Sequence, residues 1–288
     1  MTSVPTSREL DAFREQSDCF MTELLDEAYL HYSGQKETYE VEHIYEKYAE
    51  LSRLETVKSL EEAPSQLRQF AAEAFLGNLT REHQETLAAA EASLEATVDG
   101  QTIPYRMLRV ELSNEADRGR RERLERERLR LLDEQLNPVY LEAARIDNEA
   151  IRQLGAPNGY ELYKGFGYRL DELADECRAL LEETQKPWER EADKLFRERL
   201  GIGLADARPW DLARLWRAPE QDTLFPRDGM LPALEATLTD LGVDLRTQSN
   251  VGLDIEQRPN KTSRAFCARN PDNPSRFLTA RAAVTRRA

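Results

Sequence analysis

Residues 114–155, NEADRGRRERLERERLRLLDEQLNPVYLEAARIDNEAIRQLG, form the stretch that decides the fold. Apolar residues recur in it near the helical period of 3.6 residues, which predicts a long helix. The positions of this apolar stripe are Leu124, Leu131, Leu132, Leu136, Val139, Ala143 and Ile146. Pro138 lies within the stretch, and a proline ring is expected to kink a helix.

Charged residues of both signs surround this apolar stripe. Opposite charges stand four residues apart in the pairs Arg121/Glu125, Glu122/Arg126 and Arg123/Glu127. A helix that binds nucleic acid or forms a coiled coil is one interpretation, and a long helix with one solvated face is the other. We favour the solvated face, because the interleaved acidic residues cancel any basic stripe.

The same criteria predict helices along most of the chain. Thr6 and Glu9 form a capping box at the start of the first helix, and Gly34 suits its C-terminal cap. Further helices are expected at 37–62, from 65 with a pause at 77–78 and a continuation after 80, at 170–184, at 187–199, after 209 and at 229–241. The predicted fold class is mainly α: a multi-helix array with one small β-hairpin at about 95–110 and an extended segment near 250–267.

The hairpin prediction depends on LEATVDGQTIPYRMLRVEL, residues 94–112. Asp99 and Gly100 stand there between residues that favour strands. Asp-Gly suits a two-residue type I′ turn, because both residues tolerate positive φ.

Composition excludes several classes of function. Hydrophobic residues make up 40% and charged residues 33%, so the chain can bury a core. The net charge is −14, and residues 268–288 contain five Arg and one Asp, which leaves −18 on residues 1–267. Such an acidic body repels nucleic acid and anionic membranes, and we expect neither as a partner.

The location expected for the protein is the cytoplasm. Nowhere do 18 apolar residues run together, and the N-terminal residues have no apolar core of a signal peptide. Cys19, Cys177 and Cys267 are odd in number and far apart, which is neither a disulfide framework nor a metal-ligand spacing. A reducing compartment fits this usage.

Two regions are expected along the chain. Residues 1–267 form a helical region, with a subdivision near 155, and residues 268–288 form a basic, disordered tail. Pro271 and Pro274 in this tail discourage a helix.

No catalytic, cofactor-binding or metal-binding residue can be assigned from the pattern. His43 and Glu46 stand three apart on an expected helix, but two ligands do not make a zinc site. Gly165 and Gly167 lack the spacing of a phosphate-binding loop. The aromatic residues around them are interpreted as packing between helices, with the lining of a cleft as the alternative; they are Tyr160, Tyr163, Phe166 and Tyr168.

Several stretches, in this order, resemble the oligoendopeptidase F and thimet oligopeptidase family of zinc metallopeptidases. ARIDNEAIRQLGAPNGYELYKGFGYRLDE, residues 144–172, resembles its Arg-x-x-Asn-Glu, Leu-Gly and Asn-Tyr segment, and RPWDLARLW, residues 208–216, its Pro-Trp-Asp segment. LDIEQRPNKTSRAFCA, residues 253–268, resembles Leu-Asp-x-x-x-Arg-x-x-Lys-x-x-x-Ala-Phe-Cys, and the hairpin ATVDGQTIPYR, residues 96–106, also fits. The resemblance covers about residues 90–267.

The resemblance implies the helical N-terminal part of a peptidase-like fold, which forms one wall of a channel for short peptides. In the family the zinc ligands and the general base lie on a later His-Glu-x-x-His helix and the helix after it. This sequence departs from the pattern after Cys267. We therefore expect no catalytic residue and no cofactor in this chain, although zinc is expected in full-length relatives, which hydrolyse peptides.

Three interpretations of the function stay open. The first is a truncated or frame-shifted peptidase-like chain that is inactive alone and self-associates through exposed apolar helix faces. The second is a helical scaffold or interaction protein without enzymatic activity. The third is an enzyme whose site the sequence does not reveal.

Overall fold

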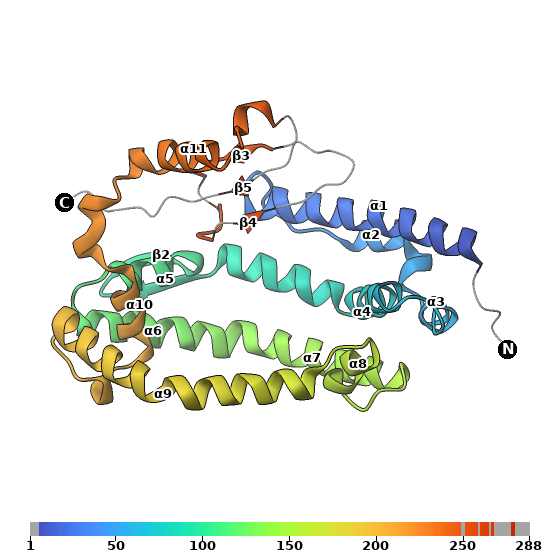
Figure 1. Cartoon of the computed structure of the whole chain (residues 1–288), viewed down its shortest axis with the longest axis horizontal. Helices are drawn as coiled ribbons and strands as arrows, with labels where there is room; N and C mark the ends of the chain where they lie inside the picture. Colours follow the sequence, from blue (N-terminus) through green and yellow to red (C-terminus); the bar gives the residue numbers. More distant parts are fainter. Residues whose placement is uncertain (1–5, 249–250, 259, 265, 268–277, 280–288) are drawn as a thin grey trace. The chain divides into compact units, whose positions relative to one another are not determined.

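The computed structural model describes residues 6–248, 251–258, 260–264, 266–267 and 278–279. As predicted, the fold is mainly α-helical with one small β-hairpin (Figure 1). The chain forms two compact units, each built from three separate segments. Unit 1 contains residues 1–31, 36–90 and 133–181, and unit 2 contains residues 32–35, 91–132 and 182–288. A boundary near residue 155 stays a prediction.

Helix α1, Ser7–Tyr32, begins and ends where the sequence predicts. The backbone N–H of Thr6 donates to Glu9 Oε2 at 2.7 Å, and the N–H of Glu9 donates to Thr6 Oγ1 at 3.3 Å. These two bonds are the expected capping box. Gly34 follows the helix with φ of +74°, a conformation that glycine adopts without a steric cost.

The single helix expected at 37–62 is wrong. This segment forms three short helices: α2, Glu42–Lys47, the 3₁₀-helix η1, Ala49–Ser52, and α3, Leu54–Ser59. Glu85 Oε1 accepts the backbone N–H groups of Val41 and Glu42 at 2.6 and 3.0 Å, which fixes the start of α2. Arg53 has an extended backbone and separates η1 from α3.

Helix α4, Ser65–Ser93, is continuous, so the expected pause at 77–78 is also wrong. Gly77 serves packing here and does not break the helix. A Cβ atom at this position would overlap the hydroxyl of Tyr45 on α2, so only a glycine admits that ring.

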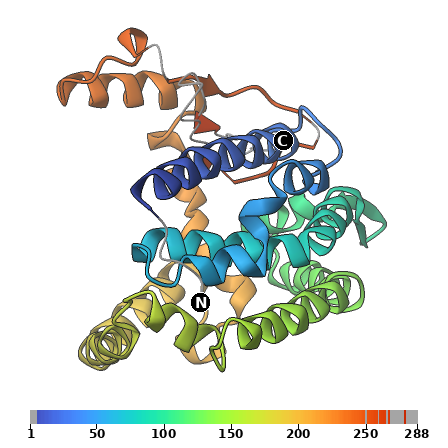
Figure 2. The ribbon, with the colours of Figure 1, turned by 90° about the vertical axis from the view of Figure 1, so that its right-hand side faces the viewer.

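The core of unit 1 joins α1, α2 and α4 around aromatic rings. Phe20 contacts Tyr45 edge to face, with ring centroids 5.1 Å apart, and contacts Phe70 in the same way at 6.1 Å. Phe20 is 2% exposed. In two views turned by 90°, the blue helices α1 and α2 lie beside the cyan helix α4 (Figure 1 and Figure 2).

In unit 2 the hairpin consists of β1, Glu95–Val98, and β2, Gln101–Pro104. Asp99 and Gly100 form the turn with φ of 53° and 76°, as a type I′ turn requires. Helix α5, Tyr105–Asn114, follows β2 directly, so the hairpin is shorter than the expected span. One face of the hairpin packs in the core of this unit through Ala96, Val98 and Ile103.

Most of the stretch 114–155 is helical, and one π-helical turn divides it into two α-helices. It forms α6, Arg118–Leu131, a π-helical turn, Leu132–Leu136, and α7, Asn137–Gln153. Pro138 has no N–H to donate to the carbonyl of Glu134, which explains why the regular ladder fails in that turn. Three positions of the predicted apolar stripe are buried, Leu124, Leu131 and Leu136, and the other four are half-buried: Leu132, Val139, Ala143 and Ile146.

Helix α8, Gly159–Gly165, precedes α9, Leu170–Leu200. The two helices expected at 170–184 and 187–199 are one helix, with Pro187 inside it. Pro187 removes only the bond to the carbonyl of Glu183, and this turn is exposed, so water can satisfy that carbonyl. Within the described part of the chain, no helix has the length and apolar character needed to cross a membrane.

The remaining elements of unit 2 are short. They are η3, Leu204–Asp206, α10, Pro209–Arg217, η4, Pro219–Leu224, η5, Arg227–Gly229, α11, Met230–Asp240, and η6, Leu245–Thr247. The extended segment contains β3, Leu253–Asp254, and β4, Phe266–Cys267, which both pair with β5, Leu278–Thr279. Apart from β5, the tail predicted to be disordered lies outside the described residues.

Replacement of Gly34 by alanine tests the close approach of the two chain segments at this position. An added Cβ would lie 2.7 Å from the backbone nitrogen of Lys261, and φ is positive. Gly201 is the matched control, because its φ is +68° but nothing lies within 4 Å. We expect Gly201→Ala to lower the free energy of unfolding by about 1 kcal/mol and Gly34→Ala by about 2–4 kcal/mol, measured by urea denaturation. Equal losses would contradict the close approach.

Candidate functional site

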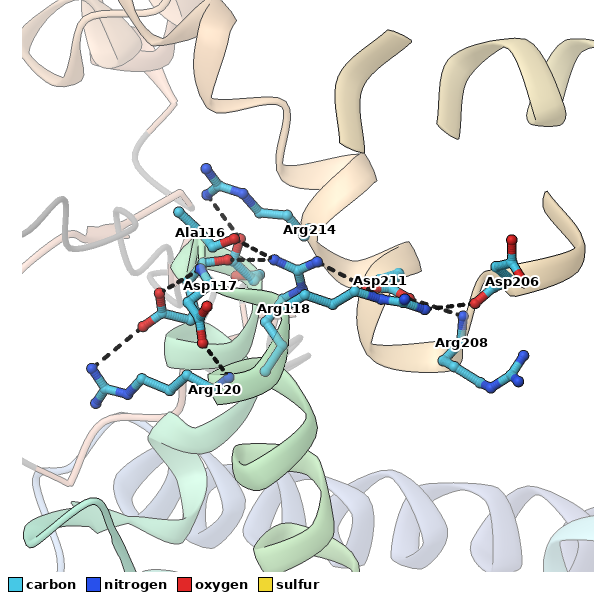
Figure 3. A network of polar contacts seen from close by, with 11 residues as sticks. Ala116, Asp117, Arg118, Arg120, Asp206, Arg208, Asp211 and Arg214 are labelled. Atoms are coloured by element: carbon cyan, nitrogen blue, oxygen red, sulfur yellow. Dashed lines mark hydrogen bonds and ion pairs between the residues drawn. The ribbon is translucent and has the colours of Figure 1, made fainter. Parts of the chain in front are cut away.

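Among the described residues of unit 2, the most completely buried carboxylate is that of Asp211 on α10, which is 0% exposed. Arg118 Nε lies 3.2 and 3.1 Å from its two oxygens, and Arg118 Nη2 donates to Oδ2 at 3.0 Å. Arg121 Nη2 donates to Oδ1 at 2.8 Å, and the backbone N–H of Arg208 donates to Oδ2 at 3.1 Å. Donors from α6 and from the start of α10 therefore surround this carboxylate (Figure 3).

The start of helix α6 places these arginines. Asp117 caps the helix by accepting the N–H of Arg120 at 2.6 Å. Arg121, which is 3% exposed, also donates to the carbonyls of Glu115 and Ala116 at 3.1 and 2.8 Å. Its guanidinium thus joins Asp211 to the chain between α5 and α6.

Burial raises the pKa of Asp211, but the hydrogen bonds from Arg121, Arg118 and the N–H of Arg208 outweigh burial, so its pKa lies below the ordinary value. A carboxylate that accepts this many donors has little capacity left to take a proton from a substrate. The Asp211 network therefore stabilises unit 2 and is not suited to general base catalysis.

Removal of this carboxylate should strongly destabilise the protein. In Asp211→Ala the Arg121 guanidinium stays buried without its counter-ion, so we expect the free energy of unfolding to fall by about 3–5 kcal/mol at pH 7. Because the pKa of Asp211 is lowered, the loss should shrink as the pH falls below 3.8, the ordinary value. Asp222→Ala is the control, since the Asp222 side chain is 42% exposed and pairs with Arg217. Urea denaturation of both variants measures the difference, and similar losses would contradict the role of burial.

A second buried network follows β3. Lys261 is 1% exposed, and its Nζ donates to Asp254 Oδ1, to the Asp254 carbonyl and to the Glu256 carbonyl at 3.0, 2.8 and 2.9 Å. Arg258 Nη1 donates to Asp254 Oδ2 at 2.8 Å and to the carbonyl of Ser33 at 3.0 Å. An ammonium group has three N–H donors, and these bonds use all three, so Lys261 is not an available nucleophile.

Unit 1 contains a cleft of about 720 Å³ between α3, the start of α4, the end of α7 and α8. Its apolar wall includes Val57, Leu162 and Phe166. Two cations and two carboxylates also line it, so the lining has no net charge; they are Lys58, Arg68, Glu61 and Glu161. Arg68 is held against the wall, where it donates to the Gly165 carbonyl at 3.3 Å and lies over the Phe166 ring. The charges favour neither an anionic nor a cationic ligand.

Of the four aromatic residues of 160–168, Phe166 and Tyr163 pack in a core cluster of unit 1, whereas Tyr160 and Tyr168 are 44% and 47% exposed. Tyr163 donates to Glu73 at 2.9 Å, Tyr168 to Gln69 at 3.0 Å and Tyr160 to Asp171 at 2.7 Å. Burial, followed by the bond to Glu73, raises the pKa of Tyr163 to about 12, so its hydroxyl is neutral at physiological pH. Only Phe166 among the four also lines the cleft.

One polar pair in unit 1 has no signal in the sequence. Burial raises the pKa of Asp147 on α7, and the charge of His83 on α4 opposes that rise. Asp147 Oδ1 and His83 Nδ1 are buried and find no hydrogen-bond acceptor or donor among the described residues. The carboxylate of Asp147 is therefore desolvated without full compensation.

This imbalance predicts that Asp147→Asn stabilises the protein at pH 7. The raised pKa means that folding disfavours the ionised form, a cost that is present above the folded-state pKa and absent below the unfolded-state pKa. We expect a higher urea midpoint at pH 7 and no change at a pH below 3.8, the ordinary value for aspartate. A lower midpoint at pH 7 would mean that Asp147 accepts a stabilising hydrogen bond.

The histidines lie on three different helices of unit 1. His31 on α1 is buried and its ring lies 5.6 Å from that of Tyr39, His43 on α2 is exposed, and His83 on α4 is half-buried. Among the described residues, no group of three His, Cys, Asp or Glu side chains is placed to hold one metal ion.

Comparison of the chain with protein-family models, with characterised proteins and with solved structures found no match.

Proposed function

We propose that this chain is the non-catalytic, channel-wall portion of a protein similar to oligoendopeptidase F and thimet oligopeptidase, and that it is inactive alone. One observation carries the proposal. Asp254, Arg258 and Lys261 have the spacing of the family's Asp-x-x-x-Arg-x-x-Lys segment, and they converge in one buried network. The family-like residues thus stand where a substitution would leave a buried charge unpaired.

The Pro-Trp-Asp segment supports the proposal in the same way. Its aspartate is Asp211, which accepts hydrogen bonds from Arg118 and Arg121. The hairpin that also fits the family packs in the core of the same unit. These stretches are therefore structural requirements of one unit, and a shared scaffold would explain why they resemble the family in order.

On this proposal, the partners of full-length relatives are short peptides, and their zinc is bound by residues that have no counterpart in this chain. We infer a cytoplasmic location from the separated cysteines and expect no binding to nucleic acid, since the net charge is −14.

The alternative is a helical scaffold or interaction protein without enzymatic activity. The bare apolar residues of α9 favour it, because Leu180 and Leu181 are 59% and 68% exposed. Self-association through such exposed apolar faces stays a prediction.

The genomic DNA that follows the codon of Cys267 separates the two proposals. The peptidase-like proposal expects a strand followed by His-Glu-x-x-His in one of the three frames. If no frame encodes it over the next few hundred codons, the peptidase-like proposal fails and the scaffold proposal is favoured.

The purified chain should bind no stoichiometric zinc and should not hydrolyse unstructured peptides. A catalytic zinc needs about three protein ligands that converge on one ion, and the three histidines are on different helices. Metal analysis after dialysis and a fluorescence-quenched peptide assay measure the two properties. One tightly bound zinc per chain, or hydrolysis that a chelator abolishes, would contradict this prediction.

A further inference from the structure

The chain between α7 and α8 ends in Asn158, and Gly159 is the first residue of α8. This is the single Asn-Gly pair in the sequence. In such a pair the backbone nitrogen of the glycine can attack the side-chain amide of the asparagine, because glycine has no side chain to obstruct the approach. Both residues belong to unit 1, and Asn158 is exposed.

The nitrogen of Gly159 is available for such a reaction. Among the described residues its N–H finds no hydrogen-bond acceptor, as is usual at the first position of a helix. An added Cβ at Gly159 would meet only Ile151 Cδ1, at 3.8 Å, so little crowds this residue. The attacking atom is therefore neither shielded by a neighbour nor engaged in a backbone hydrogen bond.

One hydrogen bond restrains the side chain that would react. Asn158 Oδ1 accepts the N–H of Glu161 at 3.0 Å and so caps α8. Ring closure requires the side-chain carbonyl carbon to turn onto the Gly159 nitrogen, so this cap must open first. Helix α8 has only 7 residues, and the end of a short helix opens at little cost in free energy.

We propose that Asn158 is a site of spontaneous deamidation. The Gly159 nitrogen attacks Cγ of Asn158, so that a new N–Cγ bond forms and the Cγ–Nδ2 bond breaks. The proton of the Gly159 N–H leaves with the amide group as ammonia, and the product is a cyclic succinimide. Water then opens the ring. Attack of water at Cγ gives aspartate, whereas attack at the backbone carbonyl carbon gives isoaspartate.

Both products replace a neutral amide by a carboxylate, but they differ in their effect on α8. Aspartate is as good a cap as asparagine, and its charge suits the start of a helix. Isoaspartate routes the main chain through Cβ and Cγ. The backbone carbonyl of Asn158, which accepts the N–H of Leu162 at 3.1 Å, then becomes part of a carboxylate outside the main chain.

Isoaspartate should therefore loosen one wall of the cleft in unit 1. Leu162 and Phe166 of α8 line this cleft, and they pack with Ile151 in a core cluster. Because the reaction needs only water, the modified fraction should increase with the age of the protein. The proposal is independent of kinship with peptidases, since it concerns the chemistry of one residue pair.

Incubation of the full chain in buffer, followed by peptide mapping with mass spectrometry, measures deamidation at each asparagine. We expect Asn158 to be modified faster than the control asparagines and to yield both aspartate and isoaspartate. The rate should rise with pH, because the attacking nitrogen must lose its proton. The chain unfolded in urea is the positive control for detection of both products.

Two asparagines of α7 are internal controls. Asn137 precedes Pro138, which has no N–H, so this residue cannot form a succinimide with loss of ammonia. Asn148 is exposed like Asn158, but the nitrogen of Glu149 after it lies inside the helix, where it donates in the backbone ladder. Both should stay unmodified while Asn158 reacts.

Two variants separate the reaction from its consequence. In Gly159→Ala the added Cβ has room in the fold but obstructs the attacking nitrogen, so we expect the rate at Asn158 to fall severalfold. Freshly purified Asn158→Asp represents the aspartate product and should have the urea midpoint of the wild type. The urea midpoint of aged wild type should fall in proportion to its isoaspartate fraction.

Three results would overturn the proposal. Modification of Asn158 in the folded chain no faster than that of Asn148 would show that the cap prevents the reaction. Aspartate without isoaspartate would indicate direct hydrolysis, since a succinimide gives both. An unchanged rate in Gly159→Ala would exclude attack by an unobstructed glycine nitrogen. The zinc and DNA tests of the proposed function are unaffected by each of these results.

Discussion

Unit 2 depends on the hydrogen bonds and ion pairs that the buried carboxylate of Asp211 makes. A carboxylate that is 0% exposed loses its hydration, and that loss is tolerable only when donors replace the water. The donors come from α6 and from the backbone that precedes α10, so the ion network fixes the position of one helix against the other. Because Arg121 also holds the carbonyls of Glu115 and Ala116, the connection from α5 is tied to the same point.

Local signals predicted the elements whose causes are local. The Thr6–Glu9 capping box and the Asp99–Gly100 turn are formed by neighbours in sequence, and both have the expected geometry. The apolar period of 114–155 likewise predicted three buried leucines of that stretch, Leu124, Leu131 and Leu136, although Leu132 is only half-buried. The mainly α fold class follows from the same short-range patterns, repeated along the chain.

The helix predictions that were wrong concern segments whose structure depends on a residue distant in the sequence or on exposure to solvent. Glu85, more than forty positions away, accepts the N–H groups of Val41 and Glu42, so α2 begins there and not at residue 37. Gly77 does not interrupt α4; its missing side chain makes room for the Tyr45 ring. Pro187 is tolerated in α9 because that turn is exposed. The presence of a proline in the sequence does not indicate whether its turn is exposed. For the candidate sites, the sequence drew attention to the segments of Asp211 and Asp254, but their burial and their arginine partners required the folded chain.

These contacts also separate two kinds of charged residue that look alike in a sequence. A carboxylate can act on a substrate only if it has a free lone pair and access to the ligand. The lone pairs of Asp211 and Asp254 accept hydrogen bonds from arginine, lysine and backbone donors instead. Their motif-like spacing therefore reflects a requirement of folding. On α9, by contrast, large apolar side chains are exposed to solvent among carboxylates.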